Sequence, residues 1–278
     1  MIAESCAPSL RGRAFGFHRA MDHLGAAIGS LIATAFLWMW PDQIRTLFLL
    51  TLIPGLMVVG LVIFGLKEIT VTPRTDDVEG IAVKQPVRLT LASFDGNFRL
   101  FLFALLVFSL GNSSDVFLLV RAEELGVPRL LIPVLWCLFH ILKSTSNLWC
   151  GAAVDRYGPK PFILAGWFFY AVIYLCFALA TNTWHIWAIF LCYALFYGLT
   201  EPAEKTLVAA LAGPERKGLA FGWFNFTIGV STLPASVLFG ALYQDFGPLT
   251  AFGVGAALAL VASLLVSLVR IPPHPHQP

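Results

Sequence analysis

The chain is organised around a polar stretch that reads Gly151-Ala-Ala-Val-Asp-Arg-Tyr-Gly-Pro-Lys160. It lies between two long apolar segments and is the densest group of polar and turn-forming residues in the second half of the sequence. Pro161 opens the second segment, as a proline can in a first helical turn, where its missing N–H would have no partner anyway. On turn chemistry alone, the stretch is expected to be a short charged connection between two helices.

The composition indicates an integral membrane protein. Hydrophobic residues make up 58% of the chain and charged residues only 12%, with a mean hydropathy of +0.79. Soluble domains carry about a quarter charged residues, so a soluble globular protein is excluded. The net charge of +2 and the lack of a basic run argue against a nucleic-acid partner. We expect the lipid bilayer to be the main environment of this chain.

Motifs of enzymes and metal sites are missing from the sequence. It contains no glycine-rich phosphate loop, no G-x-S-x-G motif and no H-E-x-x-H motif. The five cysteines fall mostly inside apolar segments without the spacing of metal ligands, and are expected to be small buried side chains: Cys6, Cys137, Cys150, Cys176 and Cys192. We therefore expect no enzymatic activity, no cofactor and no metal ion.

Eight segments are long and apolar enough to cross a bilayer, for which about 20 residues are needed. They predict an all-α, polytopic fold with spans at 14–39, 45–66, 98–120, 129–153, 161–181, 184–210, 219–243 and 249–270. Pro54, Pro202 and Pro234 fall inside three of them, which spanning helices tolerate because neighbouring groups satisfy the freed backbone.

The distribution of basic residues predicts the orientation of these spans. If the long polar segment 67–97 is cytoplasmic, eight spans place both termini on the cytoplasmic side too. That side then holds thirteen lysines and arginines, against three on the other side: Arg45, Arg121 and Arg129. Positive charge concentrates in cytoplasmic loops, so we expect both termini inside and the chain in the plasma (inner) membrane.

The chain also repeats itself. Residues 8–17 align without a gap on residues 214–223, at an offset of 206, and five of the ten positions are identical. Chance similarity between two apolar stretches rich in small residues is a competing explanation. It weakens because both copies open a predicted span, and both spans are followed by one further span. A duplication in parallel orientation is one way in which transporter folds are built.

These features resemble the major facilitator superfamily of secondary transporters. Its loop signature, G-x-x-x-D-R-x-G-x-K, is matched at all five defined positions: Gly151, Asp155, Arg156, Gly158 and Lys160. Pro159 departs from the basic residue that is commoner there. The resemblance implies alternating access of two helical bundles around a central site, with a small molecule carried with or against an ion, often a proton. It also implies a monomer, and efflux of drugs or metabolites is expected by analogy of fold.

The offset predicts which part of such a transporter the chain contains. Its eight spans would correspond to helices five to twelve of a twelve-helix member. Residues 1–66 would be a remnant of the N-terminal bundle, 67–97 a cytoplasmic linker, 98–270 a complete C-terminal six-helix bundle and 271–278 a cytoplasmic tail. A fragment unable to transport is the alternative, because a central site between two halves would lack four helices.

Polar residues inside the predicted spans are functional candidates, since they are costly in a membrane. The candidates for a substrate or ion pathway are Arg19, Asp22, Asn112, Asp115, His140, Lys143, Tyr197, Glu201 and Asn225. The clearest pattern is a stripe on one helical face: Trp136, His140, Lys143 and Asn147. Three alternatives stay open: solvation of the residues near Asp22 at the interface, a wet position for Asp115, and a structural pair for Lys143. Glu204 and Lys205 are expected at the interface.

Two contacts follow from these positions. Asp155 is expected beside the backbone N–H groups of residues 12–15, at the start of the first span, where a helix attracts negative charge. Arg156 or Lys160 would then lie near an acidic partner. Lys143 is expected to meet Asp22, because both come out at a similar depth at 1.5 Å per residue.

A rival interpretation is a membrane-embedded enzyme. It would use a zinc-like site formed by a small set of polar residues in the spans: His18, Asp22, His23 and His140.

Overall fold

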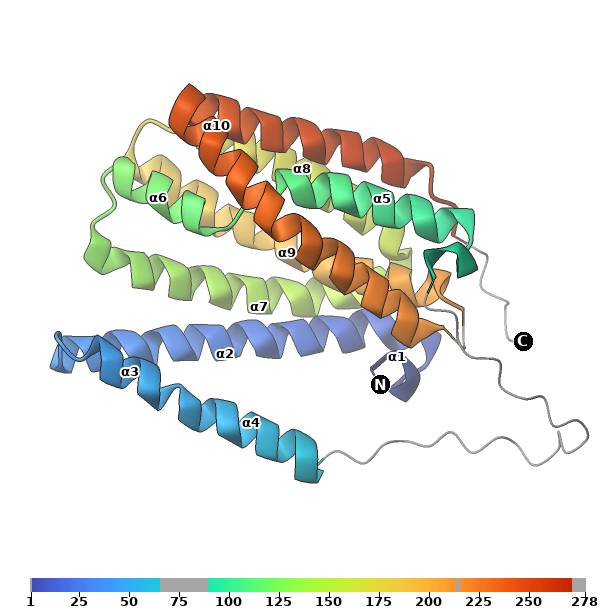
Figure 1. The fold of residues 1–278 in the computed structure, drawn as a ribbon, viewed down its shortest axis with the longest axis horizontal. Coiled ribbons are helices and arrows are strands. Elements are labelled where there is room, and N and C mark those ends of the chain that lie inside the picture. The colour runs from blue at the N-terminus through green and yellow to red at the C-terminus, as the bar shows by residue number, and fades with distance from the viewer. Residues whose placement is uncertain (1, 66–89, 214–215, 272–278) are drawn as a thin grey trace, which may run out of the picture.

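The structure is a computed structural model that describes residues 2–65, 90–213 and 216–271. Every regular element in these ranges is helical (Figure 1). The α-helices are α1 (Ile2–Ser5), α2 (Arg11–Met39), α3 (Ile44–Leu50), α4 (Leu52–Gly65), α5 (Gly96–Gly111), α6 (Val116–Glu124), α7 (Ile132–Tyr157), α8 (Pro159–Leu179), α9 (Thr183–Leu211) and α10 (Lys217–Ser267). Short 3-10 turns cover Pro8–Leu10, Leu91–Ser93 and Arg129–Leu131. The linker and tail predicted at 67–97 and 271–278, and the start of the second repeat copy, lie largely outside the described residues.

The helices agree with the predicted all-α class. In the described ranges, seven helical stretches are long and apolar enough to cross a membrane. The last of them, α10, contains a non-helical residue, Gly247, with φ of 82°. Pro248 follows it and cannot donate a backbone hydrogen bond. The break divides α10 into two segments, which correspond to the spans predicted at 219–243 and 249–270.

The span predicted over 98–120 is present as the apolar stretch Gly96–Glu124, but its helix is broken in the middle. α5 ends at Gly111, and α6 starts only at Val116. Asn, Ser and Asp side chains between them compete with the helix for backbone hydrogen bonds. The hydroxyl of Tyr170 donates to the carbonyl oxygen of Gly111 at 3.1 Å, which satisfies one of the groups that the break frees. Asn112 and Asp115 therefore lie on irregular backbone.

Helices α5 to α10 share one hydrophobic core that is rich in aromatic side chains. Phe108 stacks on Trp167 with ring centroids 4.6 Å apart, and Tyr193 stacks on Phe196 at 5.7 Å. The largest fully buried side chains of the described residues include Trp167, Tyr170, Tyr174, Tyr193, Phe98, Phe101, Phe139, Phe177, Phe190 and Phe252. This core gives α7, α8 and α9 a fixed frame, on which the polar residues are held.

The first long helix, α2, packs along α7 and reaches α9, and Figure 1 shows α2 and α7 side by side. Glycines make this contact close. A Cβ on Gly16 would lie 2.5 Å from the carbonyl oxygen of Asn147, and one on Gly151 would lie 2.5 Å from that of Gly12. Small residues let membrane helices approach at backbone distance. By contrast, α3 and α4 contain no buried residue.

Candidate functional site

Asp155 lies where the sequence predicted it, at the start of α2. Its carboxylate accepts hydrogen bonds from the backbone N–H of Gly12 at 2.6 Å and of Arg13 at 3.0 Å. The first N–H groups of a helix have no partner within the helix and carry partial positive charge. The carboxylate on the last turn of α7 thus caps α2, and the predicted contact is confirmed.

An acidic partner was predicted for Arg156 or Lys160, and neither has one among the described residues. The Lys160 ammonium donates to the carbonyl oxygens of Ser267 at 2.7 Å and Val269 at 2.8 Å, at the end of α10. The Arg156 guanidinium lies 5.2 Å from the ring centroid of Tyr157. The last carbonyls of a helix also lack partners and attract cations. The stretch 151–160 therefore joins α2 to the end of α7, and the end of α10 to the start of α8.

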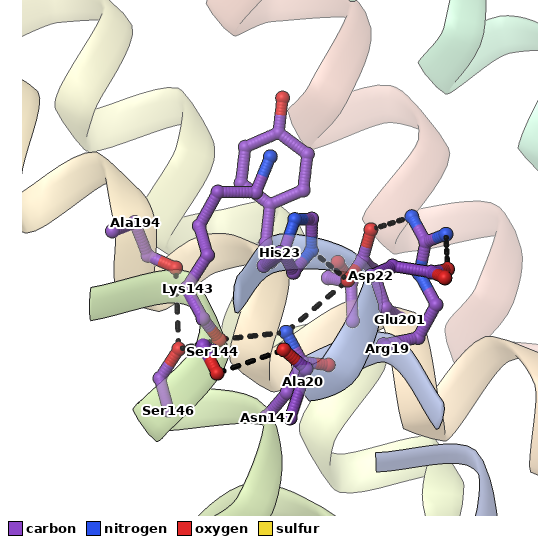
Figure 2. A network of polar contacts seen from close by, with 12 residues as sticks. Arg19, Ala20, Asp22, His23, Lys143, Ser144, Ser146, Asn147, Ala194 and Glu201 are labelled. Carbon is purple, nitrogen blue, oxygen red and sulfur yellow. Dashed lines mark hydrogen bonds and ion pairs between the residues drawn. The ribbon is translucent and has the colours of Figure 1, made fainter. Parts of the chain in front are cut away.

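Glu201 is the carboxylate that connects α2 to α9 (Figure 2). It accepts from the guanidinium of Arg19, contacts Nε2 of His23 at 2.8 Å, and accepts from Nδ2 of Asn147 at 3.1 Å. Only 11% of its side chain is exposed. A buried carboxylate with a cationic partner and further hydrogen bonds is a satisfied group. His23 and Asn147 were not among the predicted pathway residues, although His23 belongs to the site of the rival enzyme interpretation and Asn147 to the predicted stripe on α7.

The predicted contact between Lys143 and Asp22 is absent. Asp22 is 47% exposed and pairs on its own helix with Arg19 at 3.0 Å and His18 at 3.8 Å. The buried Lys143 instead places its ammonium 3.2 Å from the ring centroid of Tyr197. Ser144, next to Lys143, donates to the carbonyl oxygen of Ala20 at 2.8 Å, so the two helices are level here as expected, but the rotation of α2 is not the one expected. Its buried face includes Ala20 and His23, and the Asp22 side chain points elsewhere.

Asp115 faces protein rather than the outer interface. Its carboxylate accepts from the hydroxyls of Tyr193 at 3.1 Å and Tyr197 at 3.0 Å. A second candidate, His140, is buried among rings: it contacts Trp136 edge-on with centroids 5.0 Å apart and lies tilted against His23 at 5.4 Å. Its Nδ1 has no hydrogen-bond partner among the described residues. Four residues of the predicted stripe on α7 thus do share the inward side of that helix.

A cavity of about 330 Å³ lies between α2, α5, α9 and α10. Five of the predicted pathway residues line it: Arg19, Asn112, Tyr197, Glu201 and Asn225. Glu204 and Lys205 line it as well, and their expected position at the interface stays a prediction. The spacing offered a signal for the place of Glu204 in the cavity lining, since Glu201 and Glu204 are three residues apart and therefore share a helix face. Asp22, Asp115, His140 and Lys143 are not among its lining residues.

The described residues hold no group of three or more His, Cys, Asp or Glu side chains placed to bind a metal ion. His23 and His140 are neighbours, but His18 pairs with Asp22 on the exposed side of α2. The arrangement that the rival enzyme interpretation requires is not present in this part of the chain.

Comparison with known proteins gives a consistent family. The family model for the Major Facilitator Superfamily matches residues 101–278. The chain is 26% identical over 275 residues to an uncharacterized MFS-type transporter of Methanocaldococcus jannaschii, covering 97% of this chain and 66% of the relative. It is 24% identical over 275 residues to an uncharacterized protein of Mycobacterium tuberculosis, covering 98% of this chain and 66% of that protein. Over 152 residues it is 31% identical to the multidrug resistance protein MdtH of Photorhabdus laumondii, covering 54% of this chain and 38% of MdtH. The chain thus spans about two thirds of the length of the first two relatives.

Proposed function

Because this chain belongs to the major facilitator superfamily, we propose that it is a secondary active transporter that moves a small molecule across a membrane by alternating access. The observation that carries the proposal is the cavity that α2 shares with α5, α9 and α10. Its volume of about 330 Å³ is at the lower end of the usual range for small-molecule sites, about 300–1,000 Å³. Aromatic and charged side chains both line it, which suits a ligand with apolar and polar parts.

The ion pair between Arg19 and Glu201 supports a coupling role for this cavity. Both residues line it, and their pair connects α2 to α9. A ligand that binds Arg19 or Glu201 replaces the ion pair between these residues with a contact to the ligand. Such a ligand binds the connected and the separated arrangement with different affinity, and this difference is what shifts a conformational equilibrium.

The two ends of α2 support an access model. At its start, Asp155 caps the helix and the backbones of α2 and α7 touch. At its far end, an apolar groove of about 690 Å³ opens between α2 and α7, lined by residues that include Leu37, Pro41 and Leu130. We place the Asp155 end on the cytoplasmic side. In this proposal the stretch 151–160 is the gate that closes that side while the other side is open.

The finer assignments belong to the same proposal. The protein is a monomer in the plasma membrane with both termini cytoplasmic, and it exports drugs or metabolites in exchange for protons. The name of the relative MdtH supports efflux. Residues 98–270 form the C-terminal six-helix bundle, residues 1–66 belong to the N-terminal bundle, and the gating and pathway roles of the residues described above complete the model.

The proposal is tested by expressing the full chain in bacteria that lack their main efflux systems. The measurement is the accumulation of a panel of fluorescent amphipathic compounds and labelled metabolites. We expect at least one compound to accumulate less with the chain than with an empty vector, and Glu201→Gln to abolish the difference. Equal accumulation of every compound, with equal amounts of chain in the membrane, would instead support the transport-incompetent fragment.

A further inference from the structure

Glu204 is a buried carboxylate that takes no part in the ion pair between Arg19 and Glu201. It lies one helical turn after Glu201 on α9, is 9% exposed and lines the cavity. Its Oε1 accepts a hydrogen bond from the indole Nε1 of Trp167 on α8 at 3.0 Å. Trp167 is itself fully buried. The carboxylate is therefore buried in protein.

The neighbouring charged groups do not neutralise the negative charge that Glu204 carries when it is ionised. In the described ranges no lysine, arginine or histidine nitrogen lies within 4.0 Å of its carboxylate. The charged groups that face the same cavity are Arg19 on α2 and Glu201 and Lys205 on α9. Arg19 is occupied by Glu201 and Asp22, α8 contributes the uncharged Trp167, and the polar residues of α5 and α10 that line the cavity are uncharged.

Glu201 gives the contrast on the same helix. It is paired with Arg19 and contacted by His23 and Asn147. Among the described residues, Glu204 has one neutral donor in place of those three partners. An ionised carboxylate that is buried without a cation is costly, and binding a proton removes that charge. Two carboxylates one turn apart are thus suited to different tasks: one holds an ion pair and the other exchanges a proton.

The packing around Trp167 keeps this contact in place. A Cβ on the preceding residue, Gly166, would lie 2.4 Å from Cγ2 of Thr200 on α9, so α8 and α9 approach closely just before the indole. Phe108 stacks on the other side of the Trp167 ring at 4.6 Å. The indole is held between α5 and α9 with its N–H directed at Glu204.

We propose that Glu204 is the exchangeable proton site of the cavity, with the indole of Trp167 as its fixed hydrogen-bond donor. The carboxylate takes one proton from water in the cavity to become a carboxylic acid and returns it to water when it ionises. With the proton on one oxygen, the other can still accept from Trp167. This inference rests on the proposed function, because it supplies the coupling ion that a secondary transporter needs.

The test measures proton binding directly and needs no substrate. The full chain is purified in lipid nanodiscs, and infrared difference spectra are recorded between acid and alkaline pH. We expect the carboxylic-acid C=O absorption that is lost as the pH rises to contain a component that is missing in Glu204→Gln and remains in Glu201→Gln. Glutamine has nearly the same shape and can still accept from Trp167, so the variant is expected to fold.

The indole provides a second measurement that does not depend on removing the carboxyl group. Trp167 fluorescence, obtained as the difference between the wild type and Trp167→Phe, is expected to change over the same pH interval as the infrared band and to stay constant in Glu204→Gln. In Trp167→Phe the band should persist at a shifted frequency, because the carboxyl group loses its donor.

A titrating band that is unchanged in Glu204→Gln, or no titrating band in the wild type, would overturn the inference. Transport and proton binding fail separately. If the chain transports a compound but the band is unchanged in Glu204→Gln, the proton site is refuted and the transporter proposal stands. If the band depends on Glu204 but the chain moves no compound, the proton site stands and the transporter proposal is refuted.

Discussion

Helices α2 and α4 are both apolar and both belong to stretches long enough to cross a membrane, yet of these two only α2 has buried residues. α2 buries residues that include Gly16, Ala20 and Ala27 against its neighbours. α4 buries none, although it has the more apolar sequence of the two. Lipid tails are as apolar as leucine, so apolarity does not drive one helix onto another within a bilayer.

The contacts of α2, compared with those of α4, indicate which residues make a membrane helix pack. α2 has glycines at backbone contact with α7 and hydrogen bonds across the interface, such as Ser144 Oγ to the carbonyl oxygen of Ala20 at 2.8 Å. Arg19 adds an ion pair and His23 a polar contact to Glu201 on α9. On α4, Gly55 and Gly60 have open space where a Cβ would be. Small residues together with polar groups determine the packing, and the apolar residues determine the membrane location.

Removal of the carboxylate that holds α2 should have the largest effect. Glu201→Ala leaves Arg19 and His23 without their buried partner, and breaking a buried pair in this way costs about 3–5 kcal/mol. We expect a clear drop in the thermal denaturation temperature in detergent. Glu201→Gln is the matched control, with a smaller drop because the amide oxygen can still accept from Arg19. Equal stability of Glu201→Ala and the wild type would show that the ion pair does not hold α2.

A methyl group in the helix contact should come next. Gly16→Ala forces a Cβ to within 2.5 Å of the Asn147 carbonyl oxygen, and overpacking of this kind costs about 1–3 kcal/mol. Gly25→Ala on the same helix meets nothing within 4 Å and should stabilise the helix by up to about 1 kcal/mol. Thermal denaturation of the two variants side by side measures the contact. A destabilisation of similar size in both would contradict the close approach of α2 and α7.

Loss of the cap on α2 should have a moderate effect. Asp155→Ala removes the acceptor of the Gly12 and Arg13 N–H groups, and loss of an N-cap costs about 0.5–2 kcal/mol. Hydrogen exchange at the first turn of α2 is expected to become faster, with no change in α4. If exchange at Gly12 stays slow in this variant, the cap is not what protects the first turn.

Substitution on α4 should have the smallest effect. Leu61 is 66% exposed, and Leu61→Ala should change the stability by no more than about 0.5 kcal/mol, as for other substitutions away from packed contacts. Phe101→Ala, in the fully buried core, is the contrasting variant, with an expected cost of about 3–5 kcal/mol. A loss at Leu61 comparable to that at Phe101 would mean that α4 is packed after all.

The helices and the contact of Asp155 with α2 could be predicted from the sequence, each for a different physical reason. Apolar runs of sufficient length predict spans without knowledge of any neighbour, and Asp155 beside the start of α2 followed from the chemistry of helix ends. The partner of Glu201 could not be predicted, because depth along a helix is readable from residue number but its rotation is not. Lys143 and Asp22 have the right depth and the wrong rotation. The break at Asn112 was also missed, since the apolar residues on both sides continue the pattern of a single span.

In the proposed transport cycle α2 moves relative to α7 when a compound is transported, and a distance across the groove at the far end of α2 measures this movement. Spin labels at Met39 and Leu130, both exposed, are introduced after the native cysteines are replaced by alanine, and the distance is measured with and without a compound that the chain exports. We expect a broad or double distribution of distances between the labels, whose shorter component grows when the compound is added. A single distance that is unchanged at saturating compound would contradict the proposed movement.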